Sequence, residues 1–376
     1  MRALKLHVLV VGDNKGRDFA LCQAVKRSRN VARVDVVPAT ESCSQLEALA
    51  TEASIQGVGL CVVGPERPVV AGIGDIFRKN GIPIMCPSKE AAELEGSKAR
   101  TKLICVRYGI PTAEYRTARD MGRAYEVIHR LGMPLVLKED GLCDGKGVHI
   151  PKSLADAVRL AQEILEKALG LSPIVIERKL DGYELSFTAL CDGVNVLPLE
   201  YAVDEKRYPG TDDMTGGMGA YSHPRIVSRR LRRQILSMAK KLVRAMQKEG
   251  TPYHGVLYLG IMVTKKGPML LEVNCRFGDP EAQVLLERLK SDLVPYLLAC
   301  DTYGGLAHMP RLQWRKEAAV CVSLVEPGYP KSGHRVGSVT RLGKTLAEAH
   351  ARTYRAVRRY PGIEKLLYHP NIAAGL

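Results

Sequence analysis

The sequence predicts a mixed α/β protein, α+β in parts, whose N-terminal region is built on a parallel sheet. In the first hundred residues, short apolar runs alternate with segments of helical length, and these runs lie at residues 7–12, 34–37, 59–63 and 82–86. This alternation is typical of parallel strands joined by crossover helices. The sequence contains no apolar run of about 18 residues, which speaks against a membrane-spanning helix.

The pattern changes after residue 111, where a second unit begins. We expect a strand at 135–138, a glycine-rich turn at 141–147, and a helix that Ser153 caps and Gly170 ends. Strands at 174–178 and 184–191 follow, with Asp181-Gly182 as the turn between them. A hairpin at 256–273 and a tail with one strand and one helix complete the prediction. We therefore expect three domains, at residues 1–101, 102–317 and 318–376, the last of them short.

Composition and charge limit the class of protein. The ten cysteines are dispersed without a C-x-x-C pair, which favours reduced thiols and a cytoplasmic location over disulfides or a zinc site. The net charge is +15, and eight Lys or Arg residues lie between residues 228 and 250. No aromatic residues are interleaved with these charges, so we expect a solvated helix face and no nucleic-acid partner. A basic nucleic-acid site is the alternative.

Two stretches have the composition of a nucleotide site. Lys138 precedes a glycine-rich segment that contains Gly141, Gly145, Lys146 and Gly147, where backbone N–H groups could approach phosphate oxygens. Because a Ser or Thr does not follow Lys146, this is not a Walker A loop. From the residues alone, an ordinary strand and turn is an equally good interpretation.

The second stretch contains Glu177 and, after the turn, Glu184. A strand at this place could offer backbone groups to adenine, and a carboxylate after the turn could accept hydrogen bonds from ribose hydroxyls. The alternative is an exposed hairpin with ordinary surface charges.

A third stretch has the composition of a metal site. Glu272 and Asn274 are two residues apart on a predicted strand, so their side chains point to the same face. A carboxylate and an amide oxygen suit a hard cation such as Mg²⁺, which binds few protein groups together with nucleotide phosphates. A paired Glu and Asn on an edge strand, without a metal, is the alternative.

Taken in order, five motifs resemble those of the phosphoribosylamine–glycine ligase family of the ATP-grasp superfamily. They are VGPE at 63–66, LEGSK at 94–98, KEDG at 138–141, TGGMGAY at 215–221 and EVNCRFGDPE at 272–281. The resemblance extends from about residue 58 to residue 300. It implies a central ATP-grasp fold with an ATP lid at about 112–190 and an N-terminal domain on the substrate side. It also implies a ligase of purine synthesis that uses ATP with magnesium, or alternatively manganese, to join glycine to 5-phosphoribosylamine.

The resemblance also implies roles for individual residues. Lys102 and Lys138 would contact ATP phosphates, residues 141–147 would cover them, Glu177 and Leu180 would border adenine, and Glu184 would hold the ribose. Glu272 and Asn274 would bind the metal. Arg276 would be catalytic, together with Lys138, and would neutralise either the transferred phosphate or a substrate carboxylate. Substrate-binding residues would be Gly64, Pro65 and Glu66 for phosphoribosylamine, Gly216, Gly217 and Met218 for glycine, and also Asp279.

The chain departs from the family pattern in places that concern the amine acceptor. The first glycine-rich turn is GDNKGRDFAL at 12–21 instead of roughly G-S-G-G-R-E-H-A-L, and PATE at 38–41 replaces a P-G-N stretch. Asp213-Met214 stands where the family tends to have Pro-Asn, and the C-terminal domain is shortened near residues 337–339. Two alternatives therefore remain: a related ligase with another amine acceptor, and a non-catalytic nucleotide- or nucleic-acid-binding relative. We expect a monomer or a homodimer.

Overall fold

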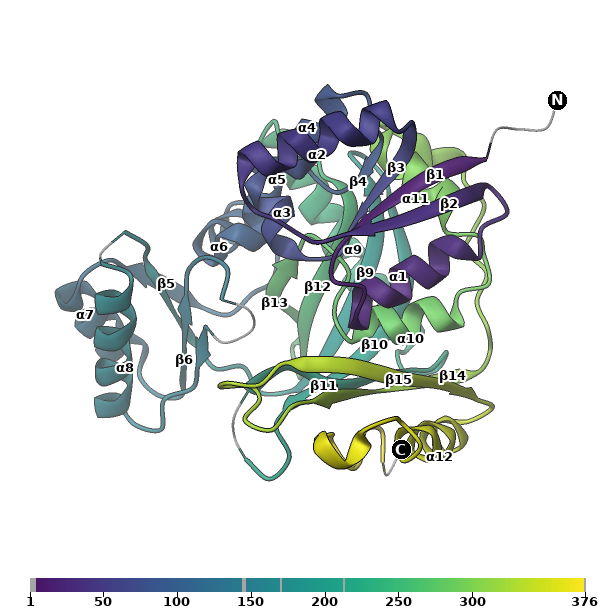
Figure 1. The fold of residues 1–376 in the computed structure, drawn as a ribbon. Coiled ribbons are helices and arrows are strands. Elements are labelled where there is room, and N and C mark those ends of the chain that lie inside the picture. Colours follow the sequence, from purple (N-terminus) through teal and green to yellow (C-terminus); the bar gives the residue numbers. More distant parts are fainter. Residues whose placement is uncertain (1–4, 144–146, 170, 212–213, 375–376) are drawn as a thin grey trace.

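The computed structural model describes residues 5–143, 147–169, 171–211 and 214–374. These residues form three sheets with helices packed against them (Figure 1). The first sheet is parallel, in the order β2-β1-β3-β4, and the other two are antiparallel. The predicted mixed α/β class with an N-terminal parallel sheet is therefore confirmed.

The N-terminal sheet is covered by helices on both faces. Its strands are β1 (Leu6–Val11), β2 (Val31–Val37), β3 (Val58–Val63) and β4 (Ile84–Met85), and the helices of this region are α1 (Gly16–Lys26), α2 (Cys43–Ile55), α3 (Glu66–Ala71), α4 (Ile73–Lys79) and α5 (Lys89–Gly96). Because side chains alternate along a strand, Val8 and Val10 of β1 pack with α1, whereas Leu9 and Val11 pack in the cluster that contains α2, α4 and α5. Both faces of the sheet are therefore apolar, as in most parallel sheets.

The central sheet has seven strands in the order β13-β12-β9-β10-β11-β14-β15. Its strands are β9 (Tyr183–Asp192), β10 (Val196–Arg207), β11 (Met214–Ser222), β12 (His254–Thr264), β13 (Gly267–Asn274), β14 (Ala318–Val325) and β15 (Arg335–Gly343). The helices packed around it are α9 (Arg229–Lys248), α10 (Glu281–Arg288), α11 (Val294–Asp301) and α12 (Leu346–Val357). Short 3₁₀ turns occur at Gly305–His308 and Ile363–Lys365.

The third sheet lies on the left of Figure 1, at one side of the molecule. It has the order β5-β8-β6-β7, with strands β5 (Tyr115–Ala118), β6 (Leu135–Glu139), β7 (Val148–His149) and β8 (Ile174–Arg178), and α6 (Lys98–Arg107) leads into it. Helices α7 (Met121–Leu131) and α8 (Leu154–Lys167) pack on one face against Leu135, Leu137 and Ile176. The alternate residues Val136, Lys138 and Glu177 therefore point to the opposite face, where a large cavity lies.

Two details of the predicted organisation are wrong, and one lies outside the described residues. Asp181-Gly182 does not turn a hairpin, because β8 pairs with β5 and β6 whereas β9 pairs with β10 and β12, in another sheet. The C-terminal segment has two strands, β14 and β15, rather than one. Ser153 caps α8 as expected, by accepting a hydrogen bond from the Asp156 N–H, but Gly170 is not described.

The last two strands extend the central sheet through pairing of β11 with β14. The domain boundaries at 101 and 317, and the lid at 112–190, stay predictions. Within the described residues, no helix is long and apolar enough to cross a membrane.

Candidate active site

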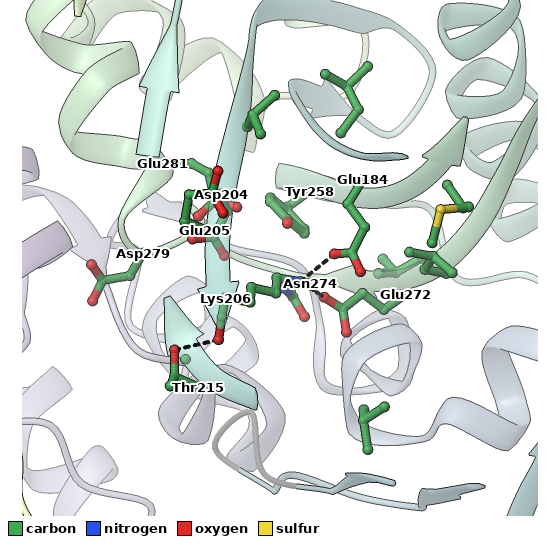
Figure 2. Close-up of a pocket in the computed structure, with 18 of the residues that line it drawn as sticks. Glu184, Asp204, Glu205, Lys206, Thr215, Tyr258, Glu272, Asn274, Asp279 and Glu281 are labelled. Atoms are coloured by element: carbon green, nitrogen blue, oxygen red, sulfur yellow. Dashed lines mark hydrogen bonds and ion pairs between the residues drawn. The ribbon is translucent and has the colours of Figure 1, made fainter. Parts of the chain in front are cut away.

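A cavity of about 1180 Å³ lies between the third sheet, the central sheet and the N-terminal region. Its lining includes most of the residues predicted for the site, among them Glu66, Lys102, Lys138, Glu177, Glu184, Gly216, Glu272, Asn274, Arg276 and Asp279. Figure 2 shows part of this lining, with acidic side chains from the central sheet and from the segment after β13 converging on the cavity. The fold therefore gathers residues that are up to about two hundred positions apart in the sequence.

A buried carboxylate between two ammonium groups forms one end of the cavity. Glu177 on β8 forms ion pairs with Lys102 of α6 and with Lys138 of β6, and the Nζ of Lys138 lies 2.7 Å from its Oε1. The Nζ of Lys102 also donates to Oγ1 of Thr112 at 2.6 Å, and that of Lys138 donates to the backbone carbonyl of Leu271 at 3.0 Å. Glu177 and Lys102 are each 2% exposed, so the exposed-hairpin alternative for Glu177 is excluded.

The charges in this group depend on one another. Burial would raise the pKa of Glu177, but Lys138 and Lys102 outweigh burial and hold it below its ordinary value. Burial lowers the pKa of Lys102 more than Glu177 raises it. Two cations share one anion, so the group carries a net positive charge next to the cavity. Such a charge suits phosphate oxygens.

The glycine-rich segment after Lys138 is anchored to the start of α6. Lys98 donates from Nζ to the carbonyl of Gly141 at 2.7 Å, and the Ala99 N–H donates to the Asp140 carboxylate at 3.0 Å. Gly141 and Gly147 line the cavity, as does Leu180. Gly145 and Lys146 lie outside the described residues.

Glu184 and Glu272 are joined by a lysine that the motifs did not single out. The Nζ of Lys206 on β10 lies 3.2 Å from Oε1 of Glu272 and 3.6 Å from Oε2 of Glu184 (Figure 2). Lys206 is the largest cause that lowers the pKa of Glu272, which is about 2 although burial opposes the shift. The residues predicted for metal and for ribose thus form one carboxylate site.

Asn274 borders the same site. With its amide oriented to satisfy its neighbours, the nitrogen donates to Oε1 of Glu95 at 3.2 Å and to the carbonyl of Val273 at 3.0 Å. The amide oxygen is then turned away from these two acceptors. Among the described residues there is no cluster of three or more His, Cys, Asp or Glu side chains that could hold a metal. A cation here would therefore need ligands from outside the protein as well, as Mg²⁺ bound to nucleotide phosphates does.

Arg276 is held by two carboxylates. Its Nε lies 3.1 Å from Oε2 of Glu66 and 3.1 Å from Oε1 of Glu95. Burial would raise the pKa of Glu66, but Arg276 and Arg17 lower it to about 2. Burial raises the pKa of Glu95, although Arg276 opposes the shift. The first glycine-rich turn also contacts the segment that carries Arg276, because Arg17 donates a hydrogen bond to the backbone carbonyl of Phe277 at 3.1 Å.

The altered first turn is closely packed around Asp18. The Asp13 N–H donates to Oδ2 of Asp18 at 3.1 Å. A side chain on either Gly12 or Gly64 would overlap the carboxylate of Asp18, so both positions require glycine. Gly64 and Pro65 do not appear in the cavity lining, whereas Glu66 does.

The predicted glycine-binding segment lies next to an arginine from β15. Arg335 donates to the backbone carbonyls of Asp279, at 2.9 Å, and Gly216, at 3.3 Å, and forms an ion pair with the Asp279 carboxylate at 3.2 Å. Gly217 has φ +113° and its missing side chain makes room for Pro280. Met218 is fully buried and does not line the cavity.

Sequence reasoning missed several cavity cations, among them Arg17, Lys206 and Arg335. Lys206 and Arg335 lie on β10 and β15, which were not predicted as strands, so no alternation pattern assigned their side chains to the site. The individual roles assigned to all the site residues stay predictions.

Comparison with known proteins agrees with this geometry. The family model described as phosphoribosylglycinamide synthetase, N domain, matches residues 6–95, and the ATP-grasp (A) domain model of the same synthetase matches residues 96–282. Phosphoribosylamine–glycine ligase of Rhizobium meliloti (strain 1021) is 40% identical, and the alignment covers 94% of this chain and 95% of the relative. The enzyme of the same name from Caulobacter vibrioides is also 40% identical, over 93% of this chain and 86% of the relative.

A solved structure supports the same assignment. The crystal structure of phosphoribosylamine–glycine ligase from Thermotoga maritima superposes with a TM-score of 0.78 at 25% identity, covering 97% of this chain and 98% of that chain. The fold is therefore that of the ATP-grasp class of carboxylate–amine ligases. Within this class, the chain belongs to the phosphoribosylglycinamide synthetase family, that of the phosphoribosylamine–glycine ligases. The resemblance predicted from the motifs is confirmed.

Replacing Glu177 by Gln should destabilise the protein strongly, because two buried ammonium groups would lose their shared carboxylate. We expect the free energy of unfolding to fall by about 3–5 kcal/mol in chemical denaturation. The control is Glu163→Gln, which removes an exposed partner of Arg159 on α8 and should cost about 1 kcal/mol or less. Equal effects of the two substitutions would contradict this account of the Glu177 group.

Replacing Glu66 by Gln should make the free energy of unfolding depend less on pH in the acid range. The pKa of Glu66 in the folded protein is about 2, below its ordinary value of 4.5. The ionised form of Glu66 therefore stabilises the folded protein when the pH is above 4.5. This contribution, up to about 3 kcal/mol, is lost as the pH falls through the folded pKa. Denaturant titrations from about pH 5 to about pH 2.5 should therefore show a smaller loss of stability in the variant. Parallel curves for the two proteins would show that Glu66 is not held in this way.

Proposed function

We propose that this protein joins glycine to 5-phosphoribosylamine at the expense of ATP, giving glycinamide ribonucleotide, ADP and phosphate in purine synthesis. The observation that carries the proposal is the single cavity in which Lys102 and Lys138, Glu272 and Asn274, and Arg276 all meet. Family membership supports it, because the named relatives are aligned over more than nine-tenths of this chain.

The chemistry divides into two displacements. A glycine carboxylate oxygen attacks the γ-phosphorus of ATP, and ADP leaves with the bridging oxygen. The amine nitrogen of phosphoribosylamine then attacks the carbonyl carbon of glycyl phosphate and loses a proton. Phosphate leaves and takes the former carboxylate oxygen with it. Such reactions depend chiefly on positioning and on neutralising negative charge in an enclosed cavity.

The described geometry suits these roles. Lys102 and Lys138 would supply the positive charge for ATP phosphates, and Gly141 and Gly147, which line the cavity, would lie over them. The carboxylate of Glu177 is occupied by the two lysines, so we infer that its backbone, with Leu180, borders adenine. Glu184 accepts from the ribose.

Glu272 and Asn274 would hold a divalent cation, for which we propose Mg²⁺, with Mn²⁺ as the alternative. The residues fit such an ion, because a cationic ammonium group already lies against the Glu272 carboxylate. When bound with ATP, the ion neutralises phosphate charge and polarises the γ-phosphoryl group. Arg276 faces the same region and would neutralise the transferred phosphate or the glycine carboxylate.

Gly216 and Asp279 would contact glycine, next to Gly217, and Glu66, which follows Gly64 and Pro65, would face phosphoribosylamine. The turn around Asp18 departs from the family pattern in a place that concerns the amine acceptor. The site residues therefore support ATP and glycine more directly than they support phosphoribosylamine. A different amine acceptor is therefore the second candidate. The cytoplasmic location, the monomeric or homodimeric state and the lack of a nucleic-acid partner stay predictions from the sequence.

Release of ADP tests the reaction. We expect ADP to form when glycine and freshly prepared phosphoribosylamine are both present, and little to form when either is left out. Turnover with glycine and another amine, but none with phosphoribosylamine, would replace the first candidate by the second. A protein that binds RNA tightly and releases no ADP with any amine would instead be a non-catalytic relative.

Replacing Glu272 by Ala tests the cation site. We expect turnover to fall by at least about a hundredfold, because the charge that fixes the cation and the phosphates is lost. Circular dichroism should show an unchanged fold, since Glu272 lies at the cavity surface. Near-normal activity would remove Glu272 from the site.

A further inference from the structure

Lys206 occupies the place where the cation of the proposed reaction would act. Its ammonium group lies 3.2 Å from a carboxylate oxygen of Glu272 and 3.6 Å from one of Glu184. The two carboxylates come from β13 and β9, and the lysine comes from β10, so three strands place one positive charge between two negative ones. The two nearby carboxylates favour the charged form of the Lys206 ammonium group.

The pairing of β10 with β11 is irregular opposite Lys206. Glu205 pairs with Gly219 and Arg207 pairs with Met214, so the extra residues of this irregularity belong to β11. The Thr215 hydroxyl donates to the Lys206 carbonyl at 2.8 Å and fixes the backbone there. The long side chain of Lys206 can still rotate and move its ammonium group while the backbone stays fixed.

This lysine differs from the other two lysines of the site. Lys102 and Lys138 share Glu177, which is 2% exposed and has both carboxylate oxygens paired with a lysine. The partners of Lys206 are open to the cavity, since the side chains of Glu272 and Glu184 are 32% and 40% exposed. Lys206 therefore shares its carboxylates with any cation that enters the cavity.

The ammonium group and a metal ion exclude each other at Glu272. A Mg²⁺ ion must approach a carboxylate oxygen to about 2.0–2.1 Å. An ammonium group that stays 3.2 Å from the same oxygen would then lie close to a like-charged ion and would repel it.

We propose that Lys206 is an internal cation that occupies the Glu272 site when no nucleotide is bound and leaves when ATP brings in the divalent ion. The negative phosphates draw the ammonium group away from Glu272 and at the same time supply ligands to the ion. Metal binding thereby depends on nucleotide binding, and the protein does not take up a divalent ion alone. This inference rests on the proposed function, because it takes Glu272 as a ligand of the ATP-associated cation.

Binding of Mn²⁺ to the full-length protein measures this dependence without any turnover. The amplitude of the free Mn²⁺ signal in electron paramagnetic resonance, corrected for the Mn²⁺ that the analogue binds without protein, gives the Mn²⁺ affinity of the protein with and without a non-hydrolysable ATP analogue. For the wild-type protein we expect the analogue to raise the Mn²⁺ affinity by about tenfold or more, within the usual range of coupling between sites. In Lys206→Met the nucleotide-free affinity should rise by about tenfold, and the effect of the analogue should shrink by a similar factor.

Three further variants make the result specific. Lys206→Gln repeats the test with a polar side chain, so that the measurement does not depend on how well the Met variant folds. Lys206→Arg keeps the positive charge and should keep the wild-type dependence on nucleotide. Lys241→Met removes a lysine of α9 that donates to the Gly109 carbonyl, and it should change neither affinity.

The inference is overturned if Lys206→Met and Lys206→Gln bind Mn²⁺ without nucleotide no more tightly than the wild type does. It is also overturned if the wild-type protein binds Mn²⁺ equally well with and without the analogue. The proposed function fails by a different result, namely normal binding of Mn²⁺ with the analogue but no ligation of glycine to phosphoribosylamine. The two failures are therefore distinguishable.

Discussion

The ion-paired group around Glu177 is the constraint on which the rest of the site depends. Two ammonium groups in an enclosed interior need a carboxylate, because an unpaired buried charge is strongly destabilising. Glu177 meets this need from β8, while Lys102 comes from α6 and Lys138 from β6. Lys138 also contacts the backbone of β13, so the third sheet is held against the central sheet at this point. The cavity exists between the two sheets because these contacts fix how they meet.

The pairing of a cation with protein carboxylates recurs along the cavity, at different degrees of burial. Arg276 is held by Glu66 and Glu95, and Arg335 is held by Asp279. Each cation that could meet a phosphate or a substrate carboxylate is thus kept in place by protein carboxylates before any substrate arrives. Such prior positioning is the main source of catalysis in phosphoryl transfer. The degree of burial differs, since the side chain of Glu177 is 2% exposed whereas those of Glu66 and Asp279 are 18% and 19% exposed.

The sequence was sufficient for the local features and for the motif series, and the reason is physical. Alternation along β13 predicts that Glu272 and Asn274 share a face, and both residues line the cavity. Pairing between distant segments leaves no such local signal. Asp181-Gly182 has the composition of a hairpin turn, but the strands on either side of it find partners in different sheets. The strand β15 was missed because glycines and polar residues interrupt its apolar alternation, and Arg335 was missed with it.

The central claim is that this cavity activates a carboxylate as an acyl phosphate before the amine attacks. The most direct test uses glycine labelled with ¹⁸O in both carboxylate oxygens, together with ATP and phosphoribosylamine, and analyses the phosphate by mass spectrometry. The account predicts that each phosphate released carries one ¹⁸O atom, because a carboxylate oxygen has become the bridging oxygen of glycyl phosphate. Unlabelled phosphate, formed along with product, would show that ATP is cleaved without activating glycine and would contradict the account.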